Sequence, residues 1–101
     1  SAIITDTEQI ELPESVTLSP IYPNPFNQTA KLSFDLPQAS SVRIEVVNML
    51  GQRVAVLLDG EALSAGSHEV SLDSNRLPSG MYFVSLQAGN QVERMPVVLV
   101  R

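Results

Sequence analysis

The stretch from position 30 to position 36 alternates strictly between apolar and polar residues. Successive side chains of a β-strand point to opposite faces, so this period of two places one face in a core and the other in water. We therefore predict a strand here, with Phe34 and Leu36 buried. The same alternation predicts further strands over residues 42–46, 54–58 and 68–72.

Turn-forming residues separate these segments. Gly51 permits a left-handed residue in a hairpin turn. The aromatic and aliphatic run after Gly80 is a further predicted strand, and Gly89-Asn90 suits a two-residue hairpin loop between it and a terminal strand. A longer loop is expected over residues 59–66. With an edge strand within residues 16–21, the pattern predicts seven strands.

No window shows the apolar spacing and end caps of a helix. The prediction is therefore an all-β domain in which two antiparallel sheets pack as a sandwich, with a small closed barrel as the alternative. At 101 residues and 11.0 kDa, the chain has room for one such core.

The segment Tyr22-Pro23-Asn24-Pro25-Phe26-Asn27 carries two prolines, which impose extended or turn geometry on the residues before them. Two aromatic rings therefore lie in a stiff loop after the first strand. We expect Tyr22 and Phe26 to plug one end of the core rather than to contact a ligand.

The net charge of −5 is unevenly placed, because the first 15 residues carry four acidic residues and no basic one. We interpret residues 1–15 as an acidic linker and residues 16–101 as the folded domain. Nucleic acid and anionic membrane surfaces require clustered Lys and Arg, so neither partner is expected. Membrane insertion is not expected either, because no apolar stretch approaches the ~20 residues of a membrane helix.

Catalytic and metal-binding chemistry finds little support in the composition. The chain has no cysteine, and His68 is its one histidine. His68 falls within an alternating strand, and no Gly-Xaa-Ser-Xaa-Gly turn offers a nucleophile. The carboxylates are scattered without the spacing of a calcium loop. We therefore expect a structural His68, no catalytic residue, no metal and no cofactor.

A carbohydrate-binding or adhesive module, attached to a secreted enzyme, is the alternative function for a small sandwich. Such a module needs exposed aromatic rings on which sugars stack. The sequence supplies no tryptophan, two tyrosines and three phenylalanines. Under this alternative, Tyr22, Phe26 or Tyr82 would contact the ligand.

Three blocks in register carry a resemblance to a known family: residues 22–27, residues 48–54 (Asn-Met-Leu-Gly-Gln-Arg-Val) and residues 77–83 (Leu-Pro-Ser-Gly-Met-Tyr-Phe). In their order and spacing, the chain resembles the C-terminal sorting domains (type A) of the bacterial type IX secretion system. The resemblance runs from about residue 18 to residue 101. The matching motif residues are Tyr22, Pro23, Asn24, Pro25, Phe26, Leu50, Gly51, Pro78, Gly80 and Tyr82.

The resemblance implies an Ig-like β-sandwich at the end of a secreted enzyme or adhesin. It further implies that the outer-membrane translocon reads the domain after transit through the periplasm, and that a sortase-like protease commonly removes it at the cell surface. The expected partners are thus the translocon, the protease and an upstream cargo domain. The protein would be secreted or displayed on the cell surface.

In that family the extreme C-terminus matters for recognition, and the basic, aliphatic, basic ending is present here. The residues implied for translocon recognition are Arg94, Met95, Val97, Val98, Leu99, Val100 and Arg101. Pro96 departs from the commoner unbroken run. Because proline donates no hydrogen bond, we expect a bulge or an unpaired edge at that point.

Overall fold

The computed structural model describes residues 16–74 and 77–101, so the predicted linker lies outside the described residues. The described part contains seven strands and no helix, so none of its segments is a helix able to cross a membrane. The strands are β2 (Thr17–Leu18), β3 (Thr29–Leu36), β4 (Ser40–Val47), β5 (Arg53–Leu63), β6 (Gly66–Asp73), β7 (Gly80–Ala88) and β8 (Gln91–Leu99).

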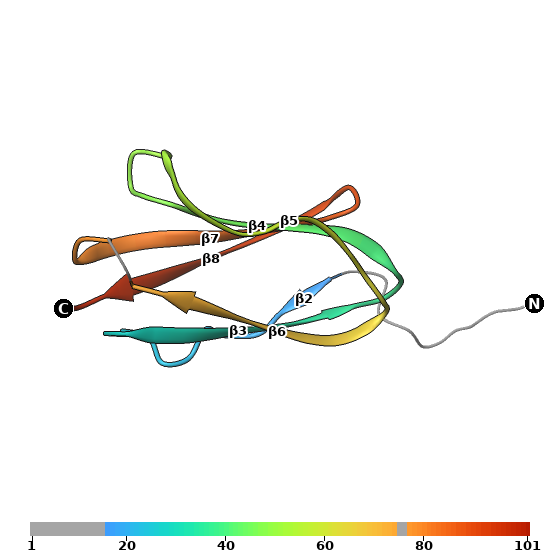
Figure 1. Cartoon of the computed structure of the whole chain (residues 1–101), viewed down its shortest axis with the longest axis horizontal. Coiled ribbons are helices and arrows are strands. Elements are labelled where there is room, and N and C mark those ends of the chain that lie inside the picture. The colour runs from blue at the N-terminus through green and yellow to red at the C-terminus, as the bar shows by residue number, and fades with distance from the viewer. Residues whose placement is uncertain (1–15, 75–76) are drawn as a thin grey trace, which may run out of the picture.

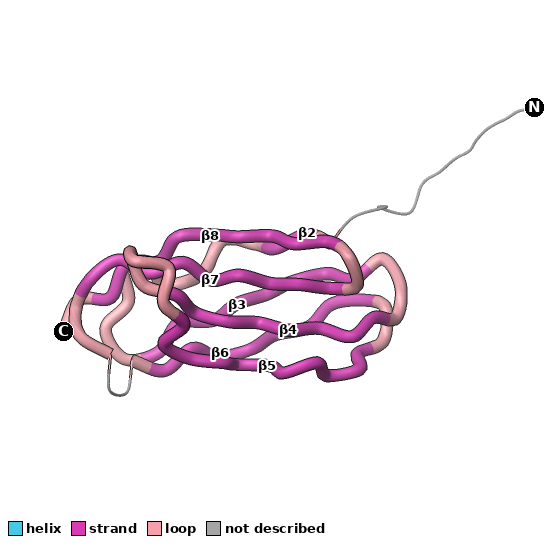
Figure 2. Tube along the Cα trace, turned by 90° about the horizontal axis from the view of Figure 1, so that it is seen from above, coloured by secondary structure: helices cyan, strands magenta, loops and turns pink. Residues whose placement is uncertain are grey.

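These strands form two antiparallel sheets, one of three strands in the order β2-β3-β6 and one of four in the order β5-β4-β7-β8. The sheets lie over one another as two layers (Figure 1), and the view from above shows the four-stranded layer running from β5 to β8 (Figure 2). Each sheet has two edges, so the predicted sandwich is confirmed and the closed barrel is wrong. The first, second and fifth strands share one sheet, as in Ig-like domains.

The core lies between the layers and is built from the alternation seen in the sequence. Phe34 and Leu36 are buried as predicted, with 1% and 4% of their surfaces exposed. His68 of β6 stacks on Phe34 with ring centroids 5.5 Å apart, and its Nε2 lies 2.7 Å from the carbonyl oxygen of Ser64. The largest fully buried side chains are Phe26, Phe34, Leu32, Ile44, Leu72, Leu86, Leu99, Val42, Val46, Val84 and Val97.

β5 departs from the prediction in both length and facing. It continues through the expected loop as far as Leu63, so residues 59–66 are not a long loop. Its pairing with β4 shifts register three times, and Gly60 lies within one irregularity with a φ of 72°. Because each bulge adds one residue, it reverses the faces of the residues beyond it. Val54 and Val56 are consequently 37% and 43% exposed instead of facing the core.

The connection from β6 to β7 contains a tyrosine corner. The hydroxyl of Tyr82 donates a hydrogen bond to the carbonyl oxygen of Pro78, four residues upstream, and the ring is buried. A tyrosine at the start of the sixth strand, bonded back to the preceding loop, is a recurring feature of Ig-type sandwiches. The bond fixes the angle at which the loop enters β7.

β8 runs unbroken across Pro96, which pairs with Phe83 of β7. The bulge expected at this position is therefore wrong. β8 is an edge strand, and a proline is accommodated on an edge where its missing N–H would face away from the neighbouring strand. The hydrogen bonds to β7 come from the residues on either side of it.

We expect Phe34→Ala to lower the free energy of unfolding by about 3–5 kcal/mol, because it leaves a cavity between tightly packed layers. Urea unfolding followed by far-UV circular dichroism measures the change. Met81→Ala, at a side chain that is 42% exposed, is the matched control and should cost less than about 1 kcal/mol. A loss below that value for Phe34→Ala would contradict its place in the core.

Candidate functional site

The three motif blocks, far apart in sequence, meet at the end of the sandwich where the chain leaves β8. Val47, which precedes the turn of the second block, pairs with Phe83 of the third, and Gly80 pairs with Leu99 of β8. Phe26 of the first block forms a parallel bridge to Leu99. Figure 1 shows the turn between β4 and β5, the start of β7 and the C-terminus at this one end.

The first block clasps the outer edge of β8, the side that faces away from β7. The N–H of Phe26 donates to the carbonyl oxygen of Val98 at 2.9 Å, and the N–H of Val100 donates to the carbonyl oxygen of Phe26 at 2.9 Å. The side chain of Asn24 accepts a hydrogen bond from the N–H of Val98 at 3.0 Å and donates one to the carbonyl oxygen of Pro96 at 3.4 Å. We call Asn24 and Phe26 the clasp.

The two aromatic residues of the first block differ in burial, because only Phe26 belongs to the clasp. The ring of Phe26 is 1% exposed and fills the core, as predicted. Tyr22 is 78% exposed, so its expected role as a core plug is wrong. Its backbone pairs in both directions with Lys31 of β3, at 3.2 and 2.7 Å. This pairing holds the main chain against β3 while the side chain remains in solvent.

Arg101 is tied back into the fold. Its Nη1 donates to the carbonyl oxygens of Ser74 at 2.9 Å and Leu77 at 2.8 Å, and its N–H donates to Oγ of Ser79 at 3.0 Å. The loop that the tyrosine corner positions is therefore also held by the end of the chain.

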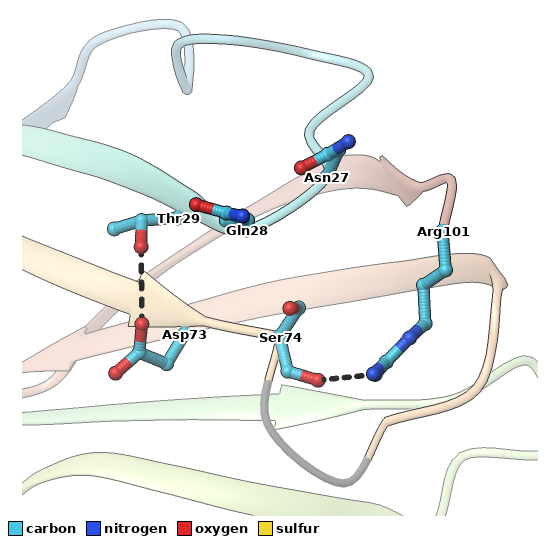
Figure 3. A pocket seen from close by; sticks show the side chains of 6 residues that line it. All are labelled: Asn27, Gln28, Thr29, Asp73, Ser74 and Arg101. Atoms are coloured by element: carbon cyan, nitrogen blue, oxygen red, sulfur yellow. Dashed lines mark hydrogen bonds between the residues drawn. The ribbon is translucent and has the colours of Figure 1, made fainter.

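An open polar depression lies beside this tether (Figure 3). The hydroxyl of Thr29 donates to Oδ1 of Asp73 across it at 3.1 Å. Nη1 of Arg101 donates to the carbonyl oxygen of Ser74, which also lines the depression. The lining residues are Asn27, Gln28, Thr29, Asp73, Ser74 and Arg101.

The residues implied for translocon recognition divide between two faces of β8. Val97 and Leu99 point into the core and are 0% and 1% exposed, and Met95 packs partly against the same core. Side chains at the alternate positions face outward, and these are Arg94, Val98 and Val100, of which Val98 is half-buried. Arg101 lies beyond β8, and its guanidinium turns back to the loop before β7. The C-terminal segment is therefore part of the folded sandwich and presents one face.

Several exposed apolar side chains lie in or next to the motif blocks. Leu50, at the tip of the turn between β4 and β5, is 82% exposed. This turn is rigid, since Oδ1 of Asn48 accepts hydrogen bonds from the N–H groups of Leu50 and Gln52, and Gly51 takes a φ of 82°. The other exposed apolar side chains at this end of the sandwich are Tyr22, Met49, Met81 and Val100.

An ion-pair network crosses the outer face of the four-stranded sheet. Oε2 of Glu45 lies 2.7 Å from Nε of Arg43 and 3.1 Å from Nη1 of Arg53, and Arg43 also reaches Asp59 at 3.2 Å. The hydrogen bonds from Arg43 and then Arg53 hold the pKa of Glu45 below its usual range. The hydrogen bond to Glu45, together with the charge of Asp59, raises the pKa of Arg43.

The aromatic residues do not form a sugar platform. Phe26, Phe34 and Tyr82 are buried, Phe83 is half-buried and Tyr22 stands alone in solvent. Stacking a sugar on Phe26 or Tyr82 would require opening the core or breaking the tyrosine corner. Among the described residues, no three His, Asp or Glu side chains are grouped so that they could hold a metal ion.

Comparison with known families agrees with this geometry. The family model for the secretion system C-terminal sorting domain matches residues 20–99. The chain belongs to this family. It is a type IX C-terminal sorting signal, and the parent protein is secreted or displayed at the cell surface. No curated protein sequence matches it significantly.

Three contacts of this sorting domain were not predicted from the sequence. The Asn24 bonds depend on a strand 72 or 74 residues away, which no local pattern indicates. The tether of Arg101 is equally remote from its loop. The tyrosine corner did have a local signal, because Tyr82 follows Pro78 by four residues at the start of a predicted strand.

We expect Asn24→Ala to lower the free energy of unfolding by about 1 kcal/mol, because two exposed hydrogen bonds to β8 are lost and water replaces them. Urea unfolding measures the change. The matched control is Asn27→Ala, whose side chain lies at the depression, and it should change stability by less than about 0.5 kcal/mol. Equal effects of the two substitutions would contradict the clasp.

A second prediction concerns pH. Because the folded pKa of Glu45 lies below its unfolded value, its ion pairs stabilise the fold above pH ~4.3, and this contribution is lost as pH falls through the folded pKa. Glu45→Gln should therefore lose more stability at pH 7 than at pH 3. Urea unfolding at both pH values tests this, with Glu61→Gln on β5 as the control. Parallel pH profiles for the wild type and Glu45→Gln would contradict it.

Proposed function

We propose that this sorting domain directs an upstream cargo domain from the periplasm through the type IX outer-membrane translocon, with the outward face of its C-terminal segment as the recognised surface. The observation that carries the proposal is the position of that segment. It lies where the three motif blocks meet, and Arg94, Val100 and Arg101 are exposed on it. The domain then acts as a folded label and performs no catalysis itself.

Two further steps follow export in this proposal. A sortase-like protease removes the domain at the cell surface, after which the cargo is released or attached to the surface. Residues 1–15 then serve as the acidic linker that the protease reaches, and residues 16–101 as the domain that is cut off. Mass spectrometry of the exported cargo would locate the cut, and a cut inside β3 to β8 would contradict this division.

The burial of Val97 and Leu99 decides how export should be tested. Deleting residues 97–101 would remove two core side chains and the tether, so loss of export could reflect loss of folding. Substitutions on the outward face avoid this difficulty. Val98 and Val100 can be compared with Val54 and Val56, which are exposed valines on β5 of the same sheet.

We expect a reporter fused to residues 16–101 to reach the surface or medium of a bacterium with the type IX system. The Val98→Ser/Val100→Ser variant should remain in the periplasm, because the recognised face has lost its apolar side chains. Cell fractionation and immunoblotting measure export, and thermal unfolding of the purified variants confirms that they fold.

The Val54→Ser/Val56→Ser variant is the matched control and should be exported like the wild type. Equal export of both double variants would refute the terminal face as the signal. Retention of the wild-type fusion would argue against sorting by this domain in that host.

A further inference from the structure

The outer edge of β8 is covered along only half of its length. In the described part of the chain, the hydrogen bonds on its outward side involve Pro96, Val98 and Val100, and the clasp makes all of them. The pairing of β8 with β7 shows no register shift, so outward backbone groups recur at every second residue. The N–H and carbonyl groups of Val92 and Arg94 therefore also face outward.

Within residues 16–74 and 77–101, these two residues have no backbone partner on that side. β8 pairs with β7 alone, and the clasp stops at Pro96. Among the described residues, no further backbone hydrogen bond reaches Val92 or Arg94. The side chain of Val92 is 56% exposed. In the part of the chain that the structure describes, two donors and two acceptors in extended geometry thus remain unpaired, which is unusual for an edge that is protected elsewhere.

The other edge of the same sheet is protected. β5 shifts register against β4 three times, and such bulges twist an edge away from flat pairing. On the outer face, Glu45 of β4 already forms ion pairs with Arg43 and with Arg53 of β5. The open half of β8 is therefore the regular stretch of edge that this sheet offers to another strand.

Arg94 adds a charge preference to this edge. Its guanidinium is exposed, and its cross-strand neighbour on β7 is the uncharged Ser85. In the described part of the chain, Arg94 takes part in none of the ion pairs. A carboxylate placed opposite it on an added strand would form a favourable cross-strand pair.

We propose that Val92 and Arg94 form a strand-addition site for a short extended segment, with an acidic residue opposite Arg94, of a protein of the secretion machinery. The inference rests on the proposed function and places part of recognition upstream of the clasped terminus. Backbone hydrogen bonds hold the segment, and the charge of Arg94 selects it. The clasp at Pro96 and the turn at Gly89-Asn90 limit the added strand to a few residues.

Backbone pairing is tested by Val92→Pro against Val92→Ala in the reporter fusion. Proline removes the outward N–H without touching the bonds to β7, just as Pro96 does in the same strand, whereas alanine keeps the donor. We expect surface export to fall at least about tenfold with proline and to change less than about twofold with alanine, where tenfold corresponds to about 1.4 kcal/mol. Equal export of the two folded variants would overturn the proposal.

The charge preference is tested by Arg94→Glu against Arg94→Lys, which leaves the backbone unchanged. Lysine should preserve export, and glutamate should reduce it by a similar factor of about ten, since it would face the acidic residue of the added strand. If Val92→Pro fails to fold, the comparison of Arg94→Glu with Arg94→Lys tests the proposal by itself. Equal export of these two Arg94 variants would then overturn the proposal. Export of the wild type with export of all four variants rejects the strand-addition site alone, whereas retention of the wild type rejects the proposed function and this inference with it.

Discussion

The backbone bonds between Phe26 and β8 join the two layers at one end of the sandwich. Phe26 lies in the segment that leads into β3 of the three-stranded sheet, whereas β8 is an edge of the four-stranded sheet. The same residue buries its ring in the core that both sheets share. One residue therefore closes the sandwich, protects a strand edge and positions the first motif block against the C-terminal segment.

The alternation around Phe34 was sufficient to predict the strands and the burial of one face, because a period of two is a local property of the chain. The facing of β5 could not be predicted, since a bulge depends on the partner strand and reverses every side chain beyond it. The prediction that Tyr22 is buried was wrong for a related reason. Its loop was recognised, but the choice of which ring enters the core depends on how the main chain pairs with Lys31.

The candidate surface was predicted only in part. The C-terminal residues were identified through a family resemblance, and the structure adds which of them face outward. Val97 and Leu99 stabilise the fold, while Arg94 and Val100 are available to a partner. Alternation within an edge strand thus lets one segment pack the core and present a surface at once. Asn24 and Arg101 could not be predicted from local sequence, because their bonds join positions that only the folded chain brings together.

The distance along the chain between Asn24 and Val98 has a consequence for what a receptor can detect. These residues are separated by 74 positions, and contacts of such separation carry the entropy of closing a long loop before they form. A misfolded chain has the same motifs in its sequence but does not bring them to one surface. A receptor that binds this end of the domain therefore distinguishes folded from misfolded chains, in addition to recognising the motif residues.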